Sequence, residues 1–258
     1  NNSLGVFVGV NGVGTLSLAN GGTVSSGGPV SVGASGTVTG NGTVVGTLSN
    51  AGAVAPGQSV GSLTLTGEYS QSVTGKLQIE LAGTSAGEFD TLSISAQATL
   101  AGTLDVELGL NGGNPFVPQL GDTFQFLTAG GGVVGKFSSA DLPTLAAGKM
   151  WQVRYSATAT TLVVKLAGDY NDNGVVDAAD YTVWRNLLGA TLDPRADGDT
   201  NGVVNIADYN IWKANFGAVA GAGAGGAAIV VSVPEPAAGM LGMSVLAILP
   251  AIARLRQR

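Results

Sequence analysis

The chain has 258 residues with 42 Gly, no Cys, no His and a formal net charge of −6. The absence of Cys and His excludes thiol nucleophiles, disulfides, the usual zinc sites and every His-based catalytic triad. No basic stripe is present, so we expect no nucleic-acid partner. The chain begins with Asn and shows no signal-peptide pattern, so we interpret it as a fragment or processed form whose export signal lies upstream.

Residues 1–167 show the alternation of apolar and polar residues that predicts β-strands. In the stretch GKLQIELAG, for example, Leu77, Ile79 and Leu81 fall on one face. A sandwich or barrel would accommodate such strands, as would a β-solenoid. The Gly-rich stretch 1–66 favours the solenoid. Strands from Ser70 to Leu166 are longer and more aromatic, and we expect them to form a wider sheet that caps it.

The stretches 50–108 and 121–139 carry a family resemblance for this region. NAGAVAPGQSVGSLTLTG and GDTFQFLTAGGGVVGKFSS resemble the repeat-rich passenger regions of autotransporter-like bacterial surface proteins. The resemblance implies a β-solenoid across 1–167. No outer-membrane barrel pattern follows, so we do not expect a self-exporting autotransporter.

Two acidic loops of similar sequence follow. DYNDNGVVDAAD begins at Asp169 and DGDTNGVVNIAD begins at Asp197, and oxygen-bearing residues occupy positions 1, 3, 5, 9 and 12 of each, with Gly at position 6 and a main-chain carbonyl ligand expected at position 7. This spacing suits Ca²⁺, which takes six to eight oxygen ligands from a tightly turning loop. The predicted ligands are Asp169, Asn171, Asn173, Val175, Asp177 and Asp180 in the first loop, and Asp197, Asp199, Asn201, Val203, Asn205 and Asp208 in the second.

A short predicted helix follows each loop, in AADYTVWRNLLGA and IADYNIWKANFGA, with Tyr181, Trp184 and Leu188 expected on one face of the first. This duplicated loop–helix with Asp at position 12 resembles a type I dockerin over residues 168–217. The resemblance implies two Ca²⁺ ions and a cohesin-like partner. By analogy, the partner would contact Ala178, Ala179, Arg185, Ile206, Ala207 and Lys213. Two alternatives remain: Ca²⁺ that only folds the module, and surface turns that bind no ion.

The chain ends in a Gly/Ala linker, 218–232, and a tail. The motif Val233-Pro234-Glu235-Pro236, an apolar stretch at 237–253 and a basic end together resemble a PEP-CTERM sorting signal. The resemblance implies recognition by an exosortase, with 237–253 as a hydrophobic helix in the membrane before processing. The alternatives are a plain tail anchor or a buried apolar helix.

No constellation of catalytic residues is apparent in 1–167, where the acidic residues alternate with apolar ones along predicted strands, so we expect no enzyme activity.

The sequence therefore predicts a mainly β protein. It comprises a β-solenoid with a wider C-terminal capping sheet, a small all-α duplicated loop–helix module and a C-terminal hydrophobic helix. The expected function is an exported structural or adhesion protein at the cell surface, cell envelope or extracellular matrix of a Gram-negative-type bacterium. The alternative is an accessory part of an extracellular polysaccharide-degrading assembly, with a glycan as partner and any catalytic domain upstream.

Overall fold

A computed structural model describes residues 4–191 and 193–221, and these residues are mainly β. Strands make up 45% of the described residues and helices 11%. The smaller of the two main sheets has six strands in the order β1 (Val6–Val8), β3 (Val30–Val32), β5 (Leu48–Asn50), β8 (Tyr69–Gln71), β11 (Ala98–Leu100) and β16 (Val133–Gly135). All of its neighbouring strands are parallel.

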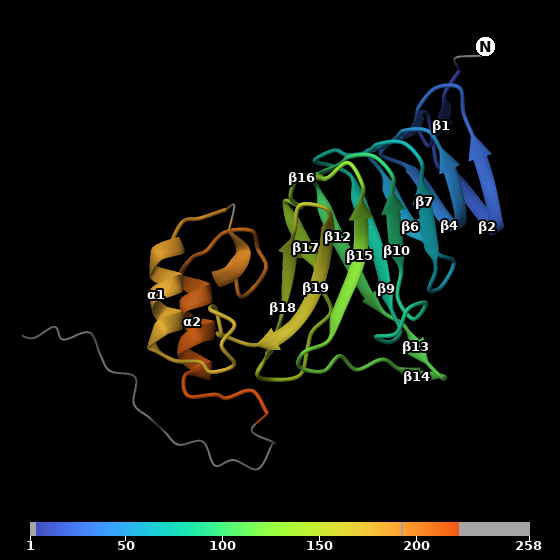
Figure 1. The fold of residues 1–258 in the computed structure, drawn as a ribbon. Helices are drawn as coiled ribbons and strands as arrows, with labels where there is room; N and C mark the ends of the chain where they lie inside the picture. The colour runs from blue at the N-terminus through green and yellow to red at the C-terminus, as the bar shows by residue number, and fades with distance from the viewer. Residues whose placement is uncertain (1–3, 192, 222–258) are drawn as a thin grey trace, which may run out of the picture.

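The larger sheet has eleven strands and curls around the core (Figure 1). Its order is β17 (Ser139–Asp141), β12 (Thr103–Leu108), β9 (Lys76–Leu81), β6 (Ala53–Pro56), β4 (Gly36–Val45), β7 (Ser62–Leu65), β10 (Thr91–Ile94), β15 (Thr123–Ala129), β19 (Ala159–Leu166) and β18 (Lys149–Tyr155), with β2 (Gly14–Ser25) also paired to β4. A two-stranded sheet, β13 (Leu110–Asn111) and β14 (Asn114–Pro115), projects from it.

The core is built by apolar residues that occupy the same position on neighbouring strands. Val38 pairs in register with Val54, Val54 with Leu77, and Leu77 with Leu104. All four side chains are completely buried. Because side chains alternate between the two faces of a strand, each such stack removes one apolar face from water while polar neighbours remain outside.

The predicted fold class is wrong in its architecture. A solenoid repeats a coil of nearly constant length. In the smaller sheet, however, Val30 pairs with Leu48 whereas Ala98 pairs with Val133, so the stretch of chain between paired strands nearly doubles. The expected capping sheet is not a separate unit either. The antiparallel strands β18 and β19 continue the eleven-stranded sheet, because β19 pairs directly with β15.

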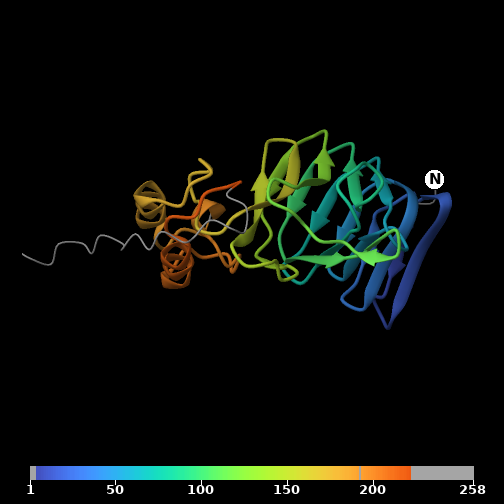
Figure 2. The ribbon, with the colours of Figure 1, turned by 90° about the horizontal axis from the view of Figure 1, so that it is seen from below.

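The expected small all-α module is also corrected. Two ten-residue helices, α1 (Ala178–Leu187) and α2 (Ile206–Asn215), and a 3-10 turn, η1 (Pro194–Ala196), lie at the end of the β-structure beside β18 and β19, away from the N-terminus (Figures 1 and 2). Met150 and Leu166 of the sheet belong to the same hydrophobic cluster as Trp184 and Trp212 of the helices. The helices therefore complete their core with the sheet and do not form a free-standing α domain.

Within residues 4–191 and 193–221, neither helix has the length and hydrophobicity needed to cross a bilayer. The predicted hydrophobic helix at 237–253 and the motif at 233–236 lie outside the described residues.

Candidate metal centre

The two acidic loops have the same backbone path. Position 4 of each is left-handed, with φ of 61° at Asp172 and 58° at Thr200. Position 6 is glycine with φ of 83° at Gly174 and 88° at Gly202. Residues other than glycine rarely adopt a backbone conformation with positive φ, so glycine at position 6 allows each loop to turn sharply in the middle. The turn predicted from the spacing is therefore present twice.

The first carboxylate of each loop lies inside this turn. Asp169 Oδ2 accepts a hydrogen bond of 2.9 Å from the Gly174 amide, and Asp197 Oδ2 accepts one of 2.9 Å from Gly202. Both aspartates are buried. The main chain therefore wraps around a carboxylate held at the same point in each loop.

The twelfth residue closes the first loop from the helix. Asp180 lies in the first turn of α1 and is completely buried. Its Oδ1 accepts from the amides of Tyr170 and Asn171, at 2.8 and 3.0 Å, and its Oδ2 accepts from Asp177 at 2.8 Å. An aspartate at position 12 therefore reaches back across the loop and joins its two ends.

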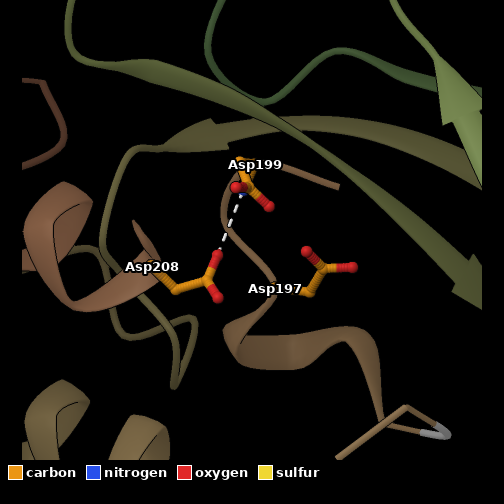
Figure 3. Close-up of side chains that lie close together, drawn as sticks. All are labelled: Asp197, Asp199 and Asp208. Atoms are coloured by element: carbon orange, nitrogen blue, oxygen red, sulfur yellow. Dashed lines mark hydrogen bonds between the residues drawn. The ribbon is translucent and has the colours of Figure 1, made fainter. Parts of the chain in front are cut away.

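Asp208 makes the same contacts in the second loop, with Gly198 and Asp199 donating to Oδ1 at 2.6 and 3.2 Å and Asn205 donating to Oδ2 at 2.7 Å. Figure 3 shows Asp197, Asp199 and Asp208 gathered together, and the dashed line marks the bond from Asp199 to Asp208. One carboxylate oxygen from each of these three lies within 4.8 Å of the others. Three carboxylates of the second loop therefore converge on one point.

In the first loop, Asn171 occupies the position of Asp199, so an amide oxygen replaces the third carboxylate. The exposed position-3 and position-5 side chains follow one pattern in both loops, because each oxygen accepts from the amide two residues later. These four bonds measure 2.8–3.2 Å and involve Asn171, Asn173, Asp199 and Asn201. Each loop therefore places acceptor oxygens along its solvent side.

Position 9 has a second role in each loop. Asp177 Oδ1 accepts from the Ala179 amide and Asn205 Oδ1 accepts from Ala207, both at 2.7 Å, and these residues are the N-caps of α1 and α2. In related loop geometries a position-9 side chain commonly reaches a cation through water, which leaves it free to cap the helix. The predicted ligand at this position is therefore also the start of each helix.

Position 7 differs in its surroundings between the loops. Val175 forms a β-bridge with Val219, whereas the Val203 carbonyl accepts a bond of 3.0 Å from Asn205 Nδ2. The first residues of the predicted linker continue this contact, since Ala220 donates to the Gly174 carbonyl at 2.8 Å. Residues 218–220 therefore lie against the first loop.

Burial and neighbouring negative charge act together on these carboxyl groups. Desolvation is the largest cause that raises the pKa of Asp180 and of Asp208, and it raises the pKa of Asp197 to about 6. Among the described residues, no Lys or Arg forms an ion pair with these three groups. A dense set of hard oxygen ligands without a protein cation suits a hard divalent ion such as Ca²⁺.

The two repeats hold each other by reciprocal contacts. The indole of Trp184 in α1 donates to the Asn205 carbonyl of the second loop at 2.7 Å. The indole of Trp212 in α2 donates to the Asp177 carbonyl of the first loop at 2.8 Å. Tyr181 packs in the same aromatic cluster, at 5.3 Å between its ring centroid and that of Trp212. Each helix therefore supports the loop of the other repeat.

Leu188 does not join this face as expected, because α1 ends at Leu187 and the side chain of Leu188 is exposed. The residues predicted to meet a protein partner all reach the surface. Ala178, Ala179, Arg185, Ile206 and Lys213 are exposed, and Ala207 is half-buried.

The ion pairs of Asp172 in the first loop do not follow from the loop motif. Asp172, which is not among the predicted ligands, forms ion pairs with Lys165 Nζ at 2.6 Å and with Arg154 Nη2 at 2.8 Å. Lys165 lies in β19 and its side chain is only 5% exposed. The first loop is therefore tied to the sheet by charge, and we call this contact the Asp172 tether. Thr200, at the same position of the second loop, is uncharged, and its hydroxyl donates to the Asp199 carbonyl at 2.7 Å.

Another buried carboxylate, Asp90, lies outside the two acidic loops. Asp90 accepts from the amides of Gly61 at 2.7 Å and Glu80 at 2.8 Å, and it lines a cavity of about 180 Å³ with Glu80 and Glu107. Burial raises the pKa of Asp90 to about 7. The sequence offered no signal for this, since Asp90 follows an ordinary turn. Its two backbone partners make it a connector between strand ends.

The sorting motif Val233, Pro234, Glu235 and Pro236 lies outside the described residues. No known protein-family model and no curated protein matches this chain.

Proposed function

We propose that residues 168–217 bind two Ca²⁺ ions, one in each loop, and that the calcium-loaded module serves as an interaction module of an exported structural or adhesion protein. The observation that carries this proposal is the repetition of one oxygen arrangement, first over 169–180 and again over 197–208. The bonds from Gly174 to Asp169 and from Gly202 to Asp197 have the same length, 2.9 Å. An oxygen-bearing side chain recurs at positions 1, 3, 5, 9 and 12 of both loops, and a plain surface turn needs no such set of oxygens.

The partner is proposed to be a protein of cohesin type that meets the outer faces of the two helices. Arg185 and Lys213 occupy the same position in the two repeats, and both are exposed. The repeats are linked reciprocally by their tryptophans, so a partner could engage either helix in a similar manner. Export and sorting by an exosortase remain proposals drawn from the tail.

The calcium proposal is tested by isothermal titration on the full chain and on Asp199→Asn. This variant gives the second loop the residue that the first loop already carries at position 3, Asn171. We expect two sites in the parent chain and about a tenfold loss of affinity at one of them in the variant, since a carboxylate ligand becomes a neutral amide. Glu107→Gln removes one exposed charge from the sheet and serves as control.

Absence of heat from Ca²⁺, or an unchanged melting temperature on adding chelator, would show that the loops are plain acidic turns. The partner proposal is tested separately, by Ca²⁺-dependent capture of a cohesin-type domain with the parent chain and with Arg185→Glu combined with Lys213→Glu. We expect the double variant to keep its calcium affinity and to lose capture. Capture that persists unchanged would move the interface away from these helix faces.

A further inference from the structure

A groove lies between the edge strand β18 and the segment that carries η1. Its volume is about 570 Å³, within the usual range for small-molecule sites. Gln152, Arg154 and Tyr155 line it from β18, Lys136 lines it from the loop after β16, and Arg195 lines it from η1. Asp172 of the first acidic loop also lines it, and a smaller cavity that shares Lys136, Gln152 and Tyr155 reaches Asp197 of the second loop.

Gln152 is the buried polar group of this groove, with 3% of the residue exposed. Its side-chain oxygen accepts a bond of 2.7 Å from Arg154 Nε. Because a guanidinium can only donate, this bond fixes the orientation of the carboxamide. The Nε2 group then has no hydrogen-bond acceptor among residues 4–191 and 193–221, and a ligand in the groove would supply one.

Two further donors are open in the groove. Lys136 Nζ lies 5.4 Å from the centre of the Tyr155 ring and forms no ion pair in the described part of the chain. Tyr155 Oη accepts from the Phe137 amide at 3.2 Å, which leaves its own proton available. Burial raises the pKa of Tyr155 to about 12, so the phenol keeps this proton at neutral pH.

The charge of the lining favours an anion over a cation. Arg154 pairs with Asp172 and Arg195 pairs with Asp193, so these four charges cancel and Lys136 leaves the groove positive. The whole chain carries −6, which makes this a local exception. A positive groove on a negative protein concentrates anions where the free donors lie.

A peptide strand fits this groove less well than a compact ligand does. Gln152 and Val153 are buried on the edge strand, and η1 packs beside it. The available groups are therefore side-chain donors and not a row of free backbone groups, which β-strand addition requires. A sugar ring with a carboxylate presents acceptors of both kinds, the anion for Lys136 and hydroxyls for Gln152 and Tyr155.

We propose that the groove between β18 and η1 binds a carboxylate-bearing saccharide, with Lys136, Gln152 and Tyr155 as the recognising residues. The ligand class is that of short uronic-acid oligomers. This site does not depend on the calcium proposal, because none of its three recognising residues is a candidate metal ligand.

The test is titration of the calcium-saturated full chain with a trimer of galacturonic acid. A neutral glucose trimer and inorganic phosphate serve as comparison ligands. We expect measurable binding of the uronate trimer and at least about tenfold weaker binding of the neutral trimer. Equal binding of the two sugars, or displacement of the uronate by phosphate at equal concentration, would overturn the proposal and leave only an adventitious anion site.

Three variants locate the ligand. Gln152→Glu keeps an acceptor for Arg154 but places a carboxylate where the free amide donor stood, and we expect at least about tenfold weaker uronate binding. Lys136→Gln should weaken binding to a similar extent without disturbing the fold. Lys149→Gln, which makes the same charge change at the other end of β18 and outside the groove, should bind like the parent chain. An equal loss in Lys149→Gln, or no loss in Lys136→Gln, would place the sugar elsewhere, for example on the bound Ca²⁺.

Discussion

The first and second acidic loops share their backbone path and carry oxygen-bearing side chains at the same positions, but they differ in how they meet the sheet. At position 4 the left-handed residue is Asp172 in one loop and Thr200 in the other. Only the aspartate reaches the cations Lys165 and Arg154 of the β-strands. Neither residue is among the proposed Ca²⁺ ligands, so the difference separates two roles within one repeat. The loop backbone, which both repeats share, positions the oxygen atoms. The ion pairs of Asp172, which occur in the first repeat, link that loop to the sheet.

The largest effect expected from a substitution in the loops concerns the twelfth residues. Asp180→Ala removes the acceptor of three backbone amides at a buried position, and Asp208→Ala does the same in the second loop. We expect each to lower the free energy of unfolding by about 3 kcal/mol, since each of the three mostly part-buried donors left without an acceptor costs about 1 kcal/mol. Denaturant unfolding followed by tryptophan fluorescence measures this, and Glu107→Gln is the control. If either variant loses less than about 1 kcal/mol, these bonds do not hold the loops.

Asp90 provides a reference for both loops, because it is a buried carboxylate that accepts from two backbone amides and is not a proposed Ca²⁺ ligand. Its pKa of about 7 means that the folded state keeps the proton up to neutral pH, while the unfolded chain releases it near pH 4. The folded state therefore binds more protons between these values, and the contribution of Asp90 to stability falls as the pH rises from about 4 to 7.

The size of this fall is up to about 4 kcal/mol. It is measured as the difference in free energy of unfolding between the parent chain and Asp90→Asn, at a series of pH values and constant calcium. Subtracting the variant cancels the titration of the loop carboxylates. A difference that does not change with pH would mean that Asp90 ionises normally in the folded protein.

The tether itself is tested at position 4. Asp172→Asn leaves Lys165 buried without a counter-ion, and we expect a loss of about 2 kcal/mol, less than for a fully buried pair because Asp172 is 40% exposed. Thr200→Ala in the second loop should change stability by less than about 0.5 kcal/mol. Adding Lys165→Met to Asp172→Asn should restore most of the loss, because the stranded charge is then gone. Equal losses of stability in Asp172→Asn and Thr200→Ala would show that the first loop is not held to the sheet more strongly than the second.

The smallest effect concerns a contact that the two repeats share. Trp184→Phe and Trp212→Phe each remove one indole bond to a carbonyl of the opposite loop. We expect about 1 kcal/mol for each, with equal values within error. The measurement is thermal unfolding followed by far-UV circular dichroism. Clearly different losses in the free energy of unfolding would show that the two indole bonds do not stabilise the two loops equally.

Local features of the site were predictable from the sequence, and distant ones were not. The sharp turns at Gly174 and Gly202 and the starts of the two helices follow from short-range chemistry, and the structure has them at these positions. Lys165 lies shortly before Asp172 in the chain, but nothing in a strand pattern tells which lysine turns inward to meet a loop. The same holds for the indole of Trp184, whose acceptor, the Asn205 carbonyl, belongs to the other repeat.

The prediction of a β-solenoid is wrong for a related reason. Alternating apolar residues identify a buried face but leave the partner strand open. The strands from Leu92 to Val164 carry larger side chains and longer connections, so the pairing offset grows along the chain instead of staying constant. That growth is a property of long-range pairing, and period-2 patterns do not encode it.

Each loop is proposed to hold one Ca²⁺ ion, and native mass spectrometry of the full chain in dilute calcium measures the number of bound ions directly. We expect two ions for the parent chain and one for Asp199→Asn at a calcium concentration that fills only the intact loop. A chain that carries no ion, or that loses both ions in the variant, would contradict this proposal.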